Sequence, residues 1–236
     1  MDGNLLAVTW ATLAGVLGTG LGGLAGALGG RARGLVTAVL GFTAGLMAGI
    51  VCFELLPEGA ALGGLWLTVV AAAAGVALVA ALARWLPGEA GDLEHTGLLV
   101  LVAIALHNLP EGMAIGAGWA AVPALGAKLA VVIGLHDFPE GMAITAPMAA
   151  AGRARPLRQT LLALLTGVPT GLGALLGVWM GTLSGQWGAI CLGLAAGAML
   201  WVTLGEMVPR LWESDGAGKV GWQLIGLLAG LVVAWI

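Results

Sequence analysis

Two short motifs in the middle of the chain carry most of its polar chemistry. Residues 107–115 read HNLPEGMAI, and residues 136–144 read HDFPEGMAI. In each motif a histidine and a glutamate stand four residues apart, which places both side chains on one face of a helix. Two such helices offer two imidazoles and two carboxylates, a ligand set that suits Zn²⁺ or Fe²⁺. We therefore predict a metal site formed by His107, Glu111, His136 and Glu140.

A second metal position is also possible beside the first. Asn108 and Asp137 each follow a motif histidine by one residue. That step rotates their side chains about 100° around the helix. They could therefore line an adjacent position, with Glu111 and Glu140 bridging the two.

A purely structural role for these polar residues is disfavoured by their number. Both motifs lie inside apolar segments, and together they contain the acids Glu111, Asp137 and Glu140. A charged side chain at the centre of a membrane costs about 2.5–3.5 kcal/mol on insertion scales. A network of mutually repelling carboxylates would be poorly stabilised there without a cation, so metal binding is the favoured interpretation.

The composition requires lipid as the solvent around these motifs. Hydrophobic residues make up 60% of the 236 positions and charged residues 9%, whereas soluble domains have about 25% charged residues. No basic stripe indicates a nucleic-acid partner. The first apolar segment, from Leu5, lacks a basic region before it, so we expect a retained helix and not a signal peptide.

We predict an all-α, polytopic membrane protein with eight transmembrane helices in one transporter-like domain, residues 1–236. An apolar span needs about 20 residues, and the breaks at Pro, Gly and charged residues place the helices near 4–28, 35–57, 64–86, 97–118, 123–148, 157–181, 187–210 and 219–236. The loops on one side fall near 29–34, 87–96, 149–156 and 211–218.

The basic residues predict the orientation. With both termini outside, the cytoplasmic loops and helix ends hold Arg31, Arg33, Arg84, Arg153, Arg155, Arg158, Arg210 and Lys219. Only Lys128 falls on the outer side. This asymmetry follows the positive-inside rule and requires an even number of spans.

An internal repeat suggests a transporter architecture. Residues 41–57 match residues 193–209 at a constant offset of 152, including Glu54 with Glu206. Five helices separate the two copies, so the copies run in opposite directions. This predicts an inverted repeat of the first three helices onto the last three, around the central pair, as in many carriers.

The motifs HNLPEG and HDFPEG, with eight spans and outside termini, resemble the ZIP (Zrt/Irt-like) family of divalent metal transporters, in its prokaryotic branch. The resemblance implies uptake of Zn²⁺, or of Fe²⁺, Mn²⁺ or Cd²⁺, across a bacterial cytoplasmic (inner) membrane. It implies a homodimer in the lipid bilayer, with the metal as substrate and no separate cofactor. It also implies an elevator in which the first, fourth, fifth and sixth helices slide against the other four.

The sequence departs from this family at the second metal position. There the resemblance implies Asn108, Glu111, Asp137, Glu140 and a carboxylate in the sixth helix. Residues 166–173 of this chain read TGVPTGLG, and the nearest counterpart is the neutral Thr170. We therefore expect one well-bound metal.

Three further acids could serve the path of the ion. Glu54 and Glu58 fall at the outer end of the second helix, and Glu206 at the inner end of the seventh. As hypotheses, the first two attract cations at the entrance and Glu206 assists release inside, although carboxylates at helix ends can also simply be solvated. His95, with its acidic neighbours, is expected on a solvated loop.

Two other functions use the same residues. An intramembrane metalloenzyme would need an open coordination position and a neighbouring base, which four protein ligands do not leave, so we do not expect an enzyme. A metal-selective channel stays an alternative, although tight coordination should slow the exit of an ion and favours a carrier.

Overall fold

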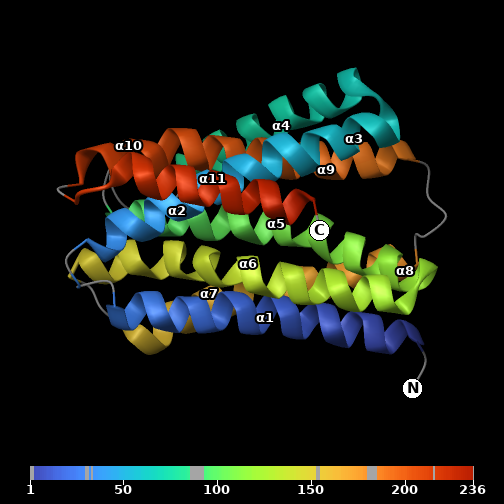
Figure 1. Ribbon diagram of the computed structural model, residues 1–236, viewed down its shortest axis with the longest axis horizontal. Coiled ribbons are helices and arrows are strands. Elements are labelled where there is room, and N and C mark those ends of the chain that lie inside the picture. The colour runs from blue at the N-terminus through green and yellow to red at the C-terminus, as the bar shows by residue number, and fades with distance from the viewer. Residues whose placement is uncertain are drawn as a thin grey trace.

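The computed structural model describes residues 3–29, 32, 34–85, 93–152, 155–179, 185–214 and 216–235. Every regular element among them is helical, as the sequence predicts. The helices lie side by side along one long axis (Figure 1). Their bounds are α1 Gly3–Gly29, α2 Leu35–Ile50, η1 Val51–Leu55, α3 Leu56–Gly63, α4 Leu65–Ala83, α5 Leu93–Ala121, α6 Pro123–Ala150, α7 Pro156–Thr166, α8 Val168–Trp179, α9 Gly185–Val202, η2 Thr203–Met207, α10 Val208–Glu213 and α11 Lys219–Ala234.

These elements form seven rods that are long and apolar enough to cross a membrane, within the described residues. α2, η1 and α3 make one continuous rod, and so do α9, η2 and α10. The eighth candidate, α11, is apolar but shorter. The prediction of an all-helical, multi-pass membrane protein is therefore confirmed, with seven or eight spans.

Two rods continue past the ends that the sequence analysis placed at residues 57 and 210. The second rod runs through Pro57 to Gly63, and the seventh runs through Pro209 to Glu213. Both prolines lie in the first turn after a π-helical segment, η1 or η2. A first helical turn tolerates a residue without an N–H group, so the rod can continue.

The sixth rod, in contrast, is interrupted. α7 ends at Thr166 and α8 begins at Val168, on either side of Gly167. Pro169 has no N–H group for the carbonyl of Leu165, four residues earlier, which explains why the ladder of backbone hydrogen bonds fails here. The sequence interpretation treated 157–181 as one uninterrupted helix and missed this break.

The rods pack as two groups. The first bundle contains α1, α5, α6, α7 and α8, and the second bundle contains η1, η2 and the remaining helices. Glycines allow close approach within each bundle: a Cβ added at Gly22 would lie 1.9 Å from the Phe138 carbonyl oxygen, and one at Gly197 would lie 1.9 Å from that of Ala72. The bundles meet where α2 packs on α6 and α9 packs on α5.

Two ends of this assembly can be distinguished. At the N-terminal end α1 begins, α5 ends and α6 begins, whereas at the opposite end α5 begins and α6 ends (Figure 1). The central pair is thus antiparallel, so its two motifs lie at similar depth from opposite directions.

Candidate metal site

Both motifs lie on unbroken stretches of helix. α5 continues through Pro110 and α6 continues through Pro139. Their neighbours along the bundle boundary are close: the Thr43 hydroxyl of α2 donates to the Pro139 carbonyl at 3.2 Å. The site is therefore held between two rigid helices of the first bundle and touches the second.

The predicted ligands meet in the interior. The His107 Nε2 atom lies 2.8 Å from Glu111 Oε1, and His136 Nε2 lies 2.7 Å from the same oxygen. His107 Nε2 also lies 3.8 Å from Glu140 Oε1. The two imidazole centroids are 6.1 Å apart. The structure thus brings His107, Glu111, His136 and Glu140 to one buried point, although their role as ligands stays a prediction.

Asp137 joins this cluster more closely than the sequence suggested. Its Oδ1 atom lies 3.5 Å from His136 Nε2. Two overlapping groups of three can hold an ion, His107 with Glu111 and His136, and His136 with Asp137 and Glu140. In each group one candidate ligand atom per residue lies within 4.8 Å of the others.

Several polar atoms of the cluster are buried without a hydrogen-bond partner among the described residues. They include both carboxylate oxygens of Asp137, both of Glu140, and Oε2 of Glu111. Buried carboxylates without partners are costly, and a divalent cation is the partner that would satisfy several of them together. The chemistry of the donors therefore fits a transition metal.

Asn108 and Thr170, the other residues of the predicted second position, have different surroundings. The Asn108 amide donates to the Thr166 carbonyl at 2.7 Å, which caps the broken end of α7. Thr170 is fully buried, and its hydroxyl has no partner among the described residues.

α1 leaves room for both Asp137 and Thr170. A Cβ added at Gly18 would lie 2.6 Å from the Asp137 Cβ, and one at Gly15 would lie 2.4 Å from the Thr170 hydroxyl. Gly15 and Gly18 share one face of α1. The glycine-rich helix α1 therefore packs closely against the side of the site that Asp137 and Thr170 form.

A cavity of about 460 Å³ connects this cluster with the N-terminal end. Glu111 and His136 line it at the depth of the site, and Glu54 and Glu58 line it from the second bundle. Glu54 is exposed to this space and lies within electrostatic range of Glu111, His136 and His107. Cys191 and Lys128, which the sequence interpretation did not place near the site, line the same cavity.

Glu206 lies on the other side of the cluster. It is buried, and its Oε2 atom accepts a hydrogen bond from the Thr96 hydroxyl at 3.5 Å. The expectation of a solvated loop around His95 is wrong: α5 begins at Leu93, and His95 is 4% exposed in its first turn. The charged residues and the short length of the segment at 87–96 suggested a loop, but packing against the second bundle buries this turn. Glu89 and Asp92 of that expected loop lie outside the described residues.

Known proteins are similar to this chain in sequence. The family model described as ZIP zinc transporter matches residues 88–236. The chain is 42% identical over 153 residues to the zinc transporter GufA of Myxococcus xanthus, over 63% of this chain and 58% of the relative. It is 36% identical to the zinc transporter ZupT of Chlorobium chlorochromatii, over 60% of this chain and 52% of the relative.

A third relative is covered more fully. The chain is 31% identical to the zinc transporter ZupT of Corynebacterium aurimucosum, over 79% of this chain and 80% of the relative. The matches with the first two relatives span little more than half of their length. With the predicted motifs, the all-helical fold and these matches in agreement, the chain belongs to the ZIP zinc transporter family.

Proposed function

We propose that this chain carries divalent transition metal ions, Zn²⁺ first among them, across a membrane into the cytoplasm. The observation that carries the proposal is the buried group of His107, Glu111, His136, Asp137 and Glu140 at the inner limit of a cavity. Imidazoles and carboxylates are ligands of Zn²⁺ and Fe²⁺. The curated relatives are named as zinc transporters, which indicates a transporter and not an enzyme.

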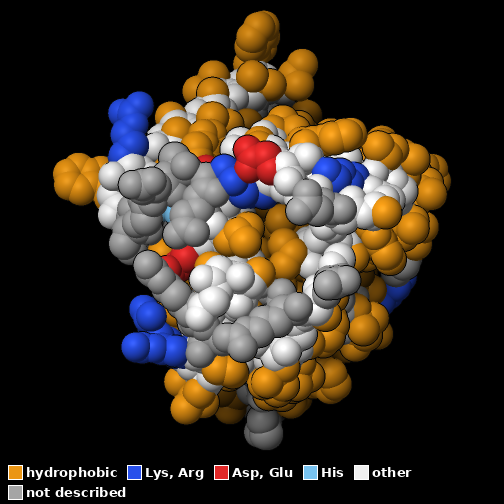
Figure 2. Space-filling model, turned by 90° about the vertical axis from the view of Figure 1, so that its left-hand side faces the viewer, with side chains coloured by type: hydrophobic (Ala, Val, Ile, Leu, Met, Phe, Trp, Pro, Cys, Tyr) orange, Lys and Arg blue, Asp and Glu red, His pale blue; other side chains and the backbone are white. Residues whose placement is uncertain are grey.

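The cavity supports a direction of travel. Glu54 and Glu58 would attract the cation, and the site would receive it from the carboxylate of Glu54. The described basic residues Arg84, Arg155, Arg158, Arg210 and Lys219 belong to elements that meet at the opposite end, and blue side chains surround that end in Figure 2. By the positive-inside rule we infer that this end faces the cytoplasm and that both termini lie outside.

A carrier with an inverted repeat is part of the same proposal. The two π-helical segments lie 152 positions apart, the offset of the sequence repeat, and each contains one of the pair Glu54 and Glu206. Gly45 approaches the Gln223 carbonyl of α11, and its repeat mate Gly197 approaches the Ala72 carbonyl of α4. In both copies, therefore, the repeated glycines contact the last helix of the other copy.

Alternating access follows from this arrangement. The site belongs to the first bundle, so a movement of that bundle against the second would carry the ion with it. Among the described residues the cavity reaches the site from the N-terminal end, which favours a carrier over a channel. We include in the proposal a homodimer in the bacterial inner membrane, as the family resemblance implies.

The test is uptake of Zn²⁺ by proteoliposomes. His107→Ala and Glu140→Ala should each reduce uptake to the level of empty vesicles, while wild-type protein accumulates the ion. Correct insertion is checked by protease protection of each variant. Full uptake by either variant would reject the site. The temperature dependence of wild-type flux, steep for a carrier and shallow for a channel, separates the two mechanisms.

A further inference from the structure

The two sides of the metal site are packed very differently. Toward the N-terminal end, the bundles are separated by the cavity that Glu54 lines. Toward the opposite end, the same bundles are in contact through buried side chains of α2, α5, α6 and α9. One side of the bundle boundary is therefore open and the other is sealed.

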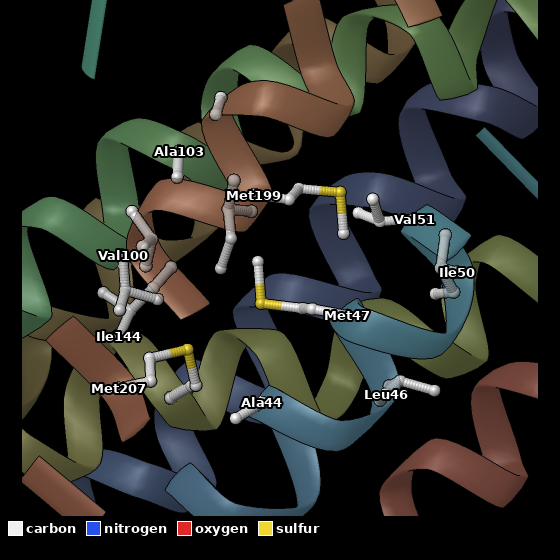
Figure 3. Close-up of a cluster of buried hydrophobic side chains, with 14 of the residues drawn as sticks. Ala44, Leu46, Met47, Ile50, Val51, Val100, Ala103, Ile144, Met199 and Met207 are labelled. Carbon is white, nitrogen blue, oxygen red and sulfur yellow. The ribbon is translucent and has the colours of Figure 1, made fainter. Parts of the chain in front are cut away.

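An apolar layer forms the first part of this seal. Val100 and Ala103 of α5 and Ile144 of α6 pack against Met47 and Met199 of the second bundle (Figure 3). On α5 this layer precedes His107 by one to two turns, and on α6 it follows Glu140 by one turn. It therefore lies directly between the site and the opposite end.

A polar layer lies beyond it. Thr96 of α5 is fully buried and donates to Glu206 of η2 at 3.5 Å, across the boundary between the bundles. His95 precedes Thr96 in the first turn of α5 and is 4% exposed, and Arg210 follows Glu206 by one turn on the second bundle. Arg210 in turn pairs with Glu213 of α10. Polar and charged side chains of both bundles thus meet at this level.

The internal repeat gives this contact a counterpart. Glu54 corresponds to Glu206 at the offset of 152, and both lie on π-helical segments. Glu54 is exposed to the open cavity, whereas Glu206 is 8% exposed and contacts the first bundle. In this one conformation, Glu54 faces the open cavity while its repeat mate Glu206 is bound to the first bundle.

We propose that Thr96 of the first bundle and Glu206 of the second form an inner gate of the transporter. The gate holds the bundles together at the opposite end while the cavity is open at the N-terminal end. Glu206 must leave Thr96 before an ion can pass from the site to that end. This role rests on the proposed transport function, in which the gate residues position the two bundles relative to each other.

A reversible cross-link tests the gate. In a chain carrying Cys52→Ser and Cys191→Ser, we would introduce Thr96→Cys together with Glu206→Cys and bridge the pair with a short bis-methanethiosulfonate. Cross-linking should abolish Zn²⁺ uptake, leave Zn²⁺ affinity within about twofold, and be reversed by dithiothreitol. Uptake that continues after complete cross-linking would overturn the proposal.

The matched control lies at the same end but within one bundle. The Thr37 hydroxyl of α2 donates to the Ser214 hydroxyl at 2.9 Å, and both residues belong to the second bundle. Thr37→Cys with Ser214→Cys, bridged in the same way, should leave uptake unchanged. Loss of uptake in this control would show that any cross-link at this end of the molecule blocks transport, and the gate would then be rejected.

An accessibility measurement tests the gate without transport. Val100→Cys, fully buried in the apolar layer, reports opening through its reaction rate with a small thiol reagent. Thr96→Val should raise this rate about threefold, the factor expected for the loss of one modest hydrogen bond, and Thr37→Val should not. Equal rates in the two variants would overturn the gate, whereas absent uptake by wild-type protein would overturn the transport function instead.

Discussion

At the scale of single residues, the cluster contains three acids and two imidazoles, and Asp137 and Glu140 are its least satisfied members. All four carboxylate oxygens of these two residues are buried without a hydrogen-bond partner among the described residues, and Asp137 Oδ1 lies 3.5 Å from His136 Nε2. Thr170, which stands where the family resemblance implies a carboxylate, has one neutral hydroxyl. On the side of the cluster that faces α1, the charge therefore belongs to Asp137 and not to Thr170.

This asymmetry predicts how each residue affects metal binding. Asp137→Asn should weaken Zn²⁺ binding about 10- to 100-fold, the range seen when a partner of a metal ligand is removed. Thr170→Val, which keeps the shape of the side chain, should change the affinity less than about twofold. Isothermal titration calorimetry of the purified variants measures both values.

The same titration gives the stoichiometry, which we expect to be one tightly bound Zn²⁺ per chain. Two tight sites, or a tenfold loss of affinity in Thr170→Val, would contradict the interpretation of Thr170. His95 lies in the first turn of α5 and not in the cluster. His95→Ala therefore serves as a control that should leave the Zn²⁺ affinity unchanged.

Proton competition is a second prediction at this scale. Zn²⁺ binds neutral imidazole and ionised carboxylate, so binding must release any protons that these groups hold. Zn²⁺ affinity should therefore fall as the pH is lowered from 7.5 to about 5.5, across the usual range of histidine titration. Calorimetry in buffers of different ionisation enthalpy counts the protons released. An affinity independent of pH would exclude histidine ligands.

At the scale of elements, close backbone contact is what holds each bundle together. Gly22 of α1 faces the Phe138 carbonyl of α6, and Gly173 of α8 faces the Leu109 carbonyl of α5. The two contacts are arranged alike on either side of the central pair. Each replaces side-chain packing by direct contact of helix backbones, which is the usual solution in lipid.

These contacts predict a strong effect of a single methyl group. In Gly22→Ala the new Cβ would lie 1.9 Å from a backbone oxygen, so α1 must move away from α6. Overpacking of this kind typically costs about 1–3 kcal/mol. A thermal unfolding assay in detergent should show a clear decrease in Tm.

Gly221→Ala is the matched control. A Cβ at Gly221, near the start of α11, would meet nothing within 4 Å. Alanine is the better helix former by about 1 kcal/mol, so this variant should unfold at the same or a slightly higher temperature. A decrease in Tm equal to that of Gly22→Ala would show that glycine flexibility, and not close approach, is what α1 requires.

The elements also show which features a sequence can predict. The helices and the pairing of the two motifs follow from the apolar pattern and from the spacing of His107 and Glu111, both of which are local. Pro169 is a local signal for the interruption at Gly167, but α5 and α6 run unbroken through prolines, so a proline alone does not predict a break. Asn108 satisfies the freed Thr166 carbonyl from another helix. The π-helical segments and the burial of His95 likewise depend on the neighbouring bundle, so no local pattern reveals them.

At the scale of the whole molecule, Glu54 and Glu206 lie at matching positions of the sequence repeat, each on a π-helical segment, but in different environments. Glu54 lies in the open cavity within electrostatic range of the site, and Glu206 is held at the sealed end. If the two bundles exchange these arrangements during transport, the two carboxylates act at different steps. Glu54 acts when the ion arrives, and Glu206 acts when it leaves.

This difference predicts separate kinetic effects of the same substitution. Glu54→Gln removes a negative charge that attracts the ion, so the KM of Zn²⁺ uptake should rise about three- to tenfold, and the increase should shrink at high ionic strength. Glu206→Gln leaves arrival unaffected, so it should change the maximal rate and leave KM within about twofold. Uptake by proteoliposomes, measured over a range of Zn²⁺ concentrations at two salt concentrations, gives both parameters.

Glu213→Gln provides the comparison for charge alone. Glu213 is exposed at the same end as Glu206, and it pairs with Arg210 of its own bundle. It should change neither KM nor the maximal rate. If Glu54→Gln and Glu206→Gln altered the same parameter to the same extent, the two carboxylates would act at one step, and the assignment of an arrival side and a release side to the two repeat copies would fail.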